Sequence, residues 1–292
     1  MDMVKQMSSI QLSPWRSRNR RRRVRLMRLA VAGALALMLI WGEDWLVYRR
    51  GGRYHPPLPG FVHEEVWLHA SDGVRLHAWF CPCPPEWASP KSERLTILYF
   101  HGTFGELTWR QGIARDWQAS LGCDVLLFDY RGYGRSGGRP SEEGLYRDAR
   151  AAYHWLIKEQ AVDPTRIVLV GRSLGGAVAL ELASEVEPRA LVLESTFTSL
   201  PEAAEALLLG LPVGLLMRNR FPSLQRIENF RGPVFLAHSE ADEVISKTHS
   251  VELWQRSRGP KELFILPSQG HGEQPGPEFY AAATRFLATH PR

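Results

Sequence analysis

Cysteine is scarce in this sequence of 292 residues. There are three cysteines, and Cys81 and Cys83 are separated only by Pro82. So few thiols cannot build the framework of a small disulfide-stabilised domain. The Cys81 and Cys83 pair also lacks the second pair of ligands that would complete a structural zinc site. We therefore expect no disulfide scaffold and no bound metal, and we expect no organic cofactor.

An excess of positive charge is absent from most of the chain. The whole sequence has a net charge of +5, but residues 1–50 alone hold 11 Lys and Arg against 3 Asp and Glu. The remaining residues hold 25 basic and 28 acidic side chains. Because the basic residues form an N-terminal cluster outside the globular part, the composition does not indicate nucleic-acid binding. We expect no nucleic acid among the partners.

Long hydrophobic runs are rare as well, and one stands out. Residues 29–42 carry no charge, and as a helix these 14 residues reach about 21 Å, short of the ~30 Å hydrocarbon layer. No small-x-small cleavage site follows, so an uncleaved signal-anchor helix fits better than a removed signal peptide. We predict a transmembrane helix over residues 26–48, which ends in an aromatic belt. The belt consists of Trp41, Trp45 and Tyr48.

The flanks of this segment predict its orientation in the membrane. Residues 1–25 are rich in arginine, and two acids follow the apolar run. The positive-inside rule then places a basic tail, residues 1–25, in the cytosol and everything beyond residue 50 on the extracytoplasmic side, which is the periplasm in a bacterium. Residues 49–61 are rich in proline and predict a short stiff tether. The alternative is a buried core helix, which leaves the arginine cluster unexplained.

Short apolar runs alternate with helical segments over residues 62–292 and predict one α/β domain. Asp72-Gly73 lies between two runs and is typical of a hairpin, so the first two strands should be antiparallel. We predict a doubly wound, mostly parallel sheet of about eight strands, with helices on both faces and a small helical lid near residues 200–230. The strand candidates are residues 66–68, 74–80, 95–100, 124–128, 167–170, 190–193, 234–237 and 263–266.

The most informative stretch is Ile167–Ala179. Four consecutive aliphatic residues predict a buried strand, and a Gly-x-Ser-x-Gly pattern centred on Ser173 follows directly. A strand, a tight turn with flanking glycines and then a helix form the context in which a nucleophilic serine is exposed at the edge of a sheet. The alternative is an ordinary strand-turn-helix corner without chemistry. The strand before Ser173 and the small residues after it favour the nucleophile.

A serine nucleophile needs an imidazole base and a carboxylate that orients it. Of the ten histidines, His271 lies between two glycines in the loop after the last strand, where its ring has room to move. The carboxylate should follow strand 234–237, and we select Asp242 there. Glu240 and Glu243 in the same loop and Glu194 at the end of the preceding strand remain as alternatives.

Hydrolysis by a serine also requires two donors for the oxyanion. One should be the backbone N–H of Leu174, directly after the nucleophile, and the other that of Thr103, in the loop after the third strand. His101 is expected to brace this loop, while Asp129 and Arg131 are expected to satisfy the backbone of their own glycine-rich turn.

Five motifs together resemble a known family. From about Pro59 to Phe286 the sequence resembles the α/β-hydrolase superfamily, in particular its small-lid branch of membrane-anchored serine hydrolases, which is related to palmitoyl-protein thioesterase-like and serine-aminopeptidase-like members. The motifs are Phe100–Gly102, Asp129–Ser136, Ser141–Leu145, Gly171–Gly176 and Glu194–Ser199.

The resemblance implies a nucleophile at Ser173, an acid at Asp242, a base at His271 and an oxyanion hole at Thr103 and Leu174. Two departures from the branch occur: Thr103 stands where Asn is usual, and the segment around Asp242 lacks the usual His-Gly-x-x-Asp-x-x-Val-Pro sequence.

These observations predict a serine hydrolase of the carboxylesterase or thioesterase kind, acting on an ester or thioester with an acyl or lipid-linked group. The apolar second half of residues 201–217, broken by Gly210, Pro212 and Gly214, suggests leucines that line a groove over the site. The alternatives are a peptidase or amidase of the same fold and a non-catalytic, membrane-anchored binding protein. The sequence does not indicate an oligomeric state.

Overall fold

The computed structural model describes residues 27, 42–49, 54–208 and 212–290. The transmembrane helix predicted over residues 26–48 therefore lies mostly outside the described residues. Within the part that is described, no helix is long and apolar enough to cross a membrane. The chain is divided at Asp44, and the second unit, which begins there, carries all the candidate site residues.

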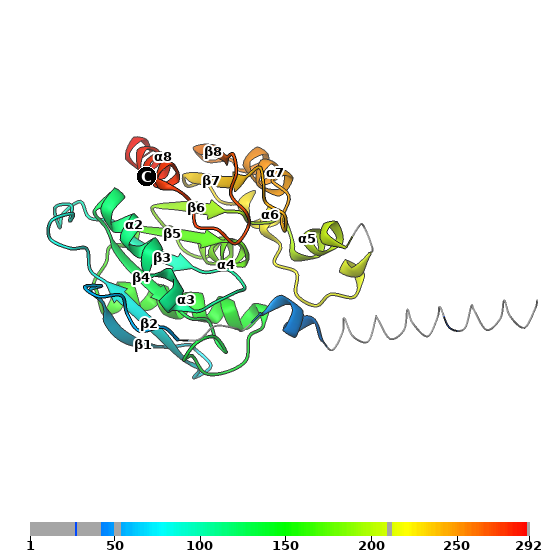
Figure 1. Cartoon of the computed structure of the whole chain (residues 1–292), viewed down its shortest axis with the longest axis horizontal. Coiled ribbons are helices and arrows are strands. Elements are labelled where there is room, and N and C mark those ends of the chain that lie inside the picture. The colour runs from blue at the N-terminus through cyan, green and yellow to red at the C-terminus, as the bar shows by residue number, and fades with distance from the viewer. Residues whose placement is uncertain (1–26, 28–41, 50–53, 209–211, 291–292) are drawn as a thin grey trace, which may run out of the picture. The chain divides into compact units, whose positions relative to one another are not determined.

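The second unit is built on one eight-stranded sheet in the order β1-β2-β4-β3-β5-β6-β7-β8 (Figure 1). β1 pairs antiparallel with β2, and β2 pairs antiparallel with β4, whereas the other pairs are parallel. The strands are β1 (Glu64–His69), β2 (Arg75–Cys81), β3 (Thr96–Phe100), β4 (Asp124–Phe128), β5 (Ile167–Arg172), β6 (Ala190–Glu194), β7 (Val234–Ser239) and β8 (Lys261–Leu266). The predicted fold class and all eight predicted strands are confirmed.

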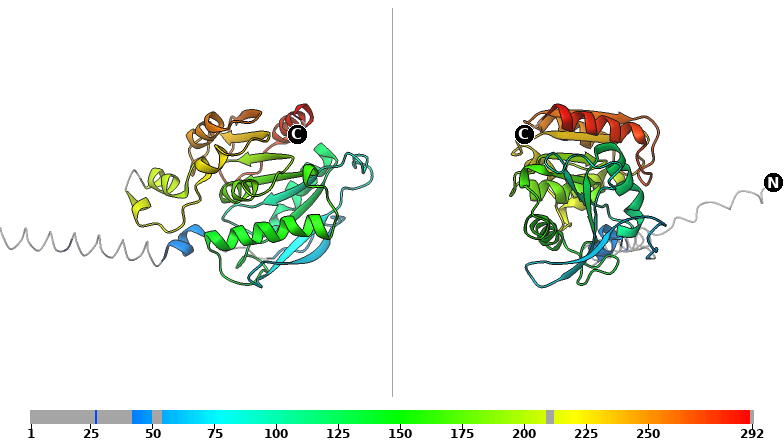
Figure 2. Two further views of the ribbon diagram at one scale, coloured as in Figure 1. Left: turned by 180° about the vertical axis from the view of Figure 1, so that it is seen from behind. Right: turned by 90° about the vertical axis from the view of Figure 1, so that its left-hand side faces the viewer.

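Helices cover both faces of the sheet (Figures 1 and 2). The helices that join the larger core cluster are α3 (Glu142–Lys158), α4 (Leu174–Ala183), α6 (Ser223–Ile227) and α7 (Thr248–Arg256). The opposite cluster includes side chains of α2 (Gln111–Leu121) and α8 (Pro277–Thr289). Because the central parallel strands are buried on both faces, they are mostly apolar and do not alternate, and polar or charged residues occur only at their ends.

Local chemistry determines where several elements begin and end. The hairpin between β1 and β2 turns at Gly73, whose φ of 82° is readily adopted only by glycine. Ser141 caps α3 by accepting a hydrogen bond from the N–H of Gly144, and two glutamates follow in the first turn, where the helix dipole favours negative charge. α2 ends at Gly122 in the left-handed conformation.

The helical insertion predicted near residues 200–230 comprises α5 (Leu200–Leu207), the short 3₁₀ helix η3 (Val213–Leu215) and α6. α5 ends before Gly210 and Pro212, and residues 209–211 lie outside the described part. Four leucines of this insertion are exposed to solvent, from 39 % for Leu216 to 82 % for Leu215. The other two are Leu207 and Leu208.

The position of Tyr48 corrects one expectation. Its side chain is 1 % exposed, and its hydroxyl donates a hydrogen bond to Oδ1 of Asn219 at 2.6 Å. Asp44 accepts from the same amide and pairs with Arg218 at 3.2 Å. Tyr48 therefore belongs to the core of the hydrolase unit and is not available for an aromatic belt at a membrane surface. Trp45, by contrast, is 73 % exposed.

Candidate active site

Ser173 lies at the sharp turn between β5 and α4. Its φ of 53° and ψ of −121° are strained for a residue with a Cβ, and such strain is typical of functional positions. Two features hold the turn: the N–H of Ser173 donates to the carbonyl of Glu194 at 2.8 Å, and Thr196 Oγ1 donates to the carbonyl of Ser173 at 2.8 Å. The strand and the helix therefore fix the direction in which the hydroxyl points.

His271 and Asp242 come from two loops that meet at this turn. His271 Nε2 lies 3.1 Å from Ser173 Oγ, and Nδ1 lies 2.8 Å from Asp242 Oδ2. An ionised carboxylate can only accept, so Nδ1 carries the proton and Nε2 is free to accept from the serine hydroxyl. The structure thus brings together the three side chains selected from the sequence, in the geometry of a nucleophile, a base and an orienting acid.

Asp242 is held as an anion by four donors. Burial by itself would raise the pKa of Asp242, but hydrogen bonds from His238, His271 and the backbone N–H of Ile245 hold the pKa well below its usual range. Oδ1 also accepts from the N–H of Val244 at 2.9 Å. An anion at Asp242 would stabilise a positive charge on the His271 ring that it contacts.

The three alternative carboxylates have other partners. Glu194 lies 3.3 Å from Arg172 Nε, and burial raises the pKa of Glu194 although the charge of Arg172 opposes this. Glu240 pairs with Lys247. Glu243 accepts from the backbone N–H of His271 at 3.0 Å and does not meet its ring. Only Asp242 among the four contacts the imidazole.

Sequence reasoning did not identify Arg172 as part of the site. Its Nη2 donates to the carbonyls of His271 at 2.6 Å and Glu273 at 2.5 Å, so the residue next to the nucleophile holds the loop that carries the base. Arg172 and Glu194 are paired in register at the ends of β5 and β6. Two opposite charges at the last positions of adjacent buried strands were the signal that could have revealed this contact.

Sequence reasoning also missed the contact between His238 and Asp242. The ring is fully buried, with Nε2 at 2.8 Å from the carbonyl of Ile245 and 3.2 Å from Asp242 Oδ2. Both neighbours of Nε2 are acceptors, so this nitrogen carries a proton, while Ser250 Oγ lies 2.7 Å from Nδ1. His238 therefore donates to the same oxygen of Asp242 that the His271 ring contacts, and helps to orient this carboxylate.

The loop after β3 places Thr103 beside the nucleophile. A Cβ built on Gly102 would lie 3.4 Å from the Cβ of Ser173. His101 Nδ1 lies 2.7 Å from the carbonyl oxygen of Gly102, and burial lowers the pKa of His101 to about 3, so the neutral ring donates this hydrogen bond. Because N–H and C=O of a trans peptide point in opposite directions, the N–H of Thr103 points away from the side that His101 occupies.

Two tyrosines hold the remaining carbonyls of this loop. Tyr130 donates to the carbonyl of His101 at 3.2 Å, and Tyr133 donates to that of Thr103 at 3.1 Å. Leu174 is the first residue of α4, where backbone N–H groups have no partner within the helix and the dipole favours negative charge. The N–H groups of Thr103 and Leu174 thus lie in the two segments that flank Ser173.

Asp129 and Arg131 bind other segments of the chain and not, as expected, the backbone of their own turn. Asp129 accepts from the N–H of Leu107 at 2.8 Å, and burial raises the pKa of Asp129 to about 6. Arg131 makes several hydrogen bonds to Asp148 and Asp72. Within the described residues, no group of three or more His, Cys, Asp or Glu side chains is arranged to hold a metal ion.

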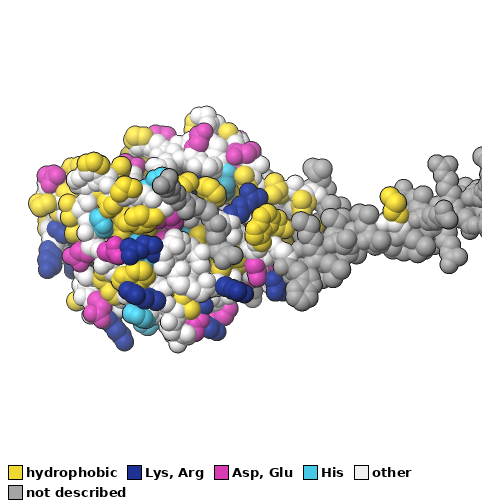
Figure 3. All heavy atoms as spheres, turned by 60° about the horizontal axis from the view of Figure 1, so that its bottom comes forward, with side chains coloured by type: hydrophobic (Ala, Val, Ile, Leu, Met, Phe, Trp, Pro, Cys, Tyr) yellow, Lys and Arg dark blue, Asp and Glu magenta, His cyan; other side chains and the backbone are white. Residues whose placement is uncertain are grey.

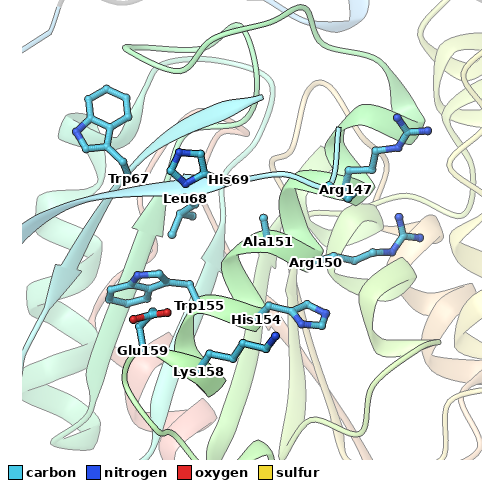
Figure 4. A pocket seen from close by; sticks show the side chains of 11 residues that line it. Trp67, Leu68, His69, Arg147, Arg150, Ala151, His154, Trp155, Lys158 and Glu159 are labelled. Atoms are coloured by element: carbon cyan, nitrogen blue, oxygen red, sulfur yellow. The ribbon is translucent and has the colours of Figure 1, made fainter. Parts of the chain in front are cut away.

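A separate pocket of about 670 Å³ lies between β1 and α3 and contains none of these site residues (Figure 4). Two of its cations already have acidic partners: Arg147 pairs with Asp72, and Arg150 pairs with Glu185. Figure 3 looks toward the face of the molecule that lies at the bottom of Figure 1, and there basic and acidic side chains are interspersed. This pocket therefore offers no surplus of charge that would select a ligand.

The fold and the site together define a class of protein, and comparison with known proteins agrees. Residues 96–215 match the family model described as the alpha/beta hydrolase fold. The chain belongs to this α/β-hydrolase family. It is 36 % identical to the uncharacterized protein Rv2307c of Mycobacterium tuberculosis over 248 residues, which cover 84 % of this chain and 86 % of the relative.

Two further likenesses extend the comparison. The chain is 34 % identical to the alpha/beta hydrolase domain-containing protein WAV2 of Arabidopsis thaliana over 274 residues, covering 83 % of this chain and 85 % of that protein. Among solved structures, the esterase Pf2001 of Pyrococcus furiosus superposes with a TM-score of 0.65 at 22 % identity, covering 82 % of this chain and 98 % of the esterase. The second likeness shows the shared fold.

Proposed function

We propose that this protein is a serine hydrolase that cleaves an ester or thioester through an acyl-Ser173 intermediate. The observation that carries the proposal is the continuous series of hydrogen bonds from Ser173 Oγ through the ring of His271 to Asp242. A serine hydroxyl does not ionise unaided at neutral pH, so it becomes a nucleophile only when a base takes its proton. His271 Nε2 lies where that base must be.

The proposed reaction has two halves. Ser173 Oγ attacks the substrate carbonyl while His271 Nε2 takes its proton, and the N–H groups of Thr103 and Leu174 bind the resulting oxyanion. Collapse of this intermediate breaks the bond to the leaving oxygen or sulfur, which His271 protonates. Water then attacks the acyl-Ser173 ester with His271 again as base, and the acid leaves. Asp242 stabilises the imidazolium in both halves.

The protein of similar fold from Pyrococcus furiosus is an esterase, which supports the ester or thioester class in preference to amides. We also propose that the protein belongs to the small-lid, membrane-anchored branch of the family, because the motifs around Ser173 and Glu194 resemble that branch. A peptidase or amidase and a non-catalytic binding protein are the competing functions, and both are outcomes of the tests below.

We predict that a fluorophosphonate probe labels the folded protein at Ser173. Ser173→Ala should abolish labelling, because the probe bonds covalently to an activated serine oxygen. Ser195→Ala is the matched control, since Ser195 is also buried with a positive φ of 46° but has no role in the proposed site. Mass spectrometry of labelled peptides gives the answer. Absence of label on wild type, or equal label on Ser173→Ala, would leave the binding protein as the better description.

We also propose that the apolar segment before residue 44 anchors the chain in a membrane, with the hydrolase unit on the extracytoplasmic side. Arginines before the segment and acids after it support this orientation. We predict that alkaline phosphatase fused after residue 60 is active and that extraction of the chain requires detergent. A stably expressed but inactive fusion would reverse the orientation, and extraction by salt alone would argue against an anchor.

A further inference from the structure

A groove of about 570 Å³ runs beside the loop that carries Thr103. Its volume is in the range of small-molecule binding sites. One wall comes from residues 55–58, within the segment 49–61 predicted as a tether, and the other from the 3₁₀ helix η1 (Leu107–Arg110) and the start of α2. The residues that line it, most of them with apolar surfaces, are His55, Pro56, Leu58, Thr108, Trp109, Gln111 and Gly112.

Backbone hydrogen bonds fix the tether wall in place. The N–H of His55 donates to Thr108 Oγ1 at 3.1 Å, and the N–H of Leu58 donates to Gln111 Oε1 at 2.6 Å. Phe61 is buried at the end of this segment. Because main-chain groups make these bonds, the side chain of Leu58 is left for the groove and is 47 % exposed. The wall is formed before any ligand binds.

A row of aromatic rings joins the groove to the candidate oxyanion loop. Phe104 directly follows Thr103 and is 53 % exposed. Its ring centroid lies 5.4 Å from that of Trp109, which in turn lies 5.8 Å from His55. An exposed phenylalanine next to an oxyanion donor has no role in the core, so its ring offers apolar contact to a substrate.

The loop that carries His271 borders the same groove. A Cβ built on Gly112 would lie 3.2 Å from Oε1 of Gln274, three residues after His271. The groove therefore lies between the two loops that supply the base and one oxyanion donor. This placement connects it to the chemistry at Ser173, whereas the exposed leucines of α5 and η3 have no such connection among the described contacts.

We propose that this groove binds the apolar acyl chain of the substrate, an inference that rests on the proposed serine-hydrolase function. His271 must protonate the leaving oxygen or sulfur, so the leaving group lies on the His271 side of Ser173. The acyl substituent then extends toward the oxyanion loop, along Phe104 and Trp109, to Leu58. Each methylene that enters the groove is removed from water, which strengthens binding of the transition state.

The test is a series of p-nitrophenyl esters from acetate to octanoate, measured below the concentration at which each ester aggregates. For wild type we expect kcat/KM to rise along the series. Leu58→Glu and Phe104→Ala should each lower the ratio of octanoate to acetate kcat/KM on the order of tenfold, the effect of losing one or two buried methylenes. Both side chains are exposed, so neither change disturbs the core.

Two matched controls use other exposed apolar positions. Val62→Glu places the same charge directly after the tether and outside the groove, at a side chain that is 60 % exposed, and Leu208→Glu places it on the lid. Both should keep the wild-type ratio. A ratio that falls in Leu208→Glu but not in Leu58→Glu would locate the acyl chain under the lid and overturn the proposal.

The proposed function and the acyl groove are rejected by different results. If no ester in the series is hydrolysed in a Ser173-dependent manner, the proposed function fails and the acyl groove with it. If hydrolysis depends on Ser173 but the ratio is unchanged by Leu58→Glu and Phe104→Ala, the acyl groove alone is rejected. A wild-type profile that is flat beyond butyrate rejects it as well.

Discussion

We expect Asp242→Asn to lower kcat for ester hydrolysis by about 10⁴, as the loss of a triad carboxylate does elsewhere. The amide of asparagine has one acceptor oxygen and no negative charge. Even if that oxygen accepts from Nδ1–H of His271, the side chain does not stabilise the imidazolium as a carboxylate does. Both histidine rings contact the same oxygen, Oδ2, so an NH₂ group at that position would meet two N–H groups and could accept from neither. An NH₂ group at the Oδ1 position would instead face the N–H groups of Val244 and Ile245. The ring of His271 would then lose both its tautomer and its orientation. Steady-state kinetics on a short p-nitrophenyl ester measures the effect.

The three other carboxylates are the controls for this variant. Glu194→Gln, Glu240→Gln and Glu243→Gln should keep most of the activity, because none of these side chains contacts the imidazole ring. A variant among them that loses activity by orders of magnitude, while Asp242→Asn does not, would show that the acid is misassigned.

The lowered pKa of Asp242 also predicts how protonation of this carboxylate enters the pH profile. A carboxylate whose folded pKa lies below its unfolded value, ordinarily about 4, stabilises the fold above that value, and the stabilisation is lost as the pH falls through the folded pKa. Asp242 is thus ionised across the pH range of an esterase assay. Protonation of Asp242 should therefore make no contribution to the pH profile of wild-type kcat above about pH 5.

Gly175→Ala is expected to destabilise the fold by about 4 kcal/mol or more, or to prevent folding. A Cβ at this position would overlap the carbonyl oxygen of Phe100 at the end of β3, and both atoms belong to elements that cannot shift without moving the sheet. For a unit of this size we expect the Tm to fall by about 10 °C, measured by calorimetry or circular dichroism.

Gly272→Ala is the matched control, because it lies beside His271 and a Cβ there meets no atom within 4 Å. Its Tm should stay close to that of wild type, within the effect of about 0.5 kcal/mol typical of surface changes. A Gly175→Ala protein as stable as Gly272→Ala would contradict the close approach of α4 to β3.

Much of the fold was predictable because its signals are local. Apolar runs such as Ile167–Val170 predict buried parallel strands, and Asp72-Gly73 predicts the hairpin that makes β1 antiparallel. α2 and α7 were not predicted. The pattern Ile113, Ala114, Trp117 and Leu121 has the spacing of a helix face and could have identified α2. α7 is short and amphipathic. The loop before it predicted only candidate carboxylates for the site.

The sequence alone identified Ser173 and His271 as candidates and restricted the acid to four carboxylates, because a nucleophile elbow and the loops after later strands are recognisable from order and residue type. Only the tertiary structure decided which carboxylate meets His271, since Glu194, Asp242 and Glu243 all lie at or just after the ends of neighbouring parallel strands. It also decided that Arg172 holds the His271 loop, that Tyr48 is buried against Asn219, and that residues 54–58 form a wall of a groove. These contacts join segments far apart in the chain, and no local pattern encodes the distance between them.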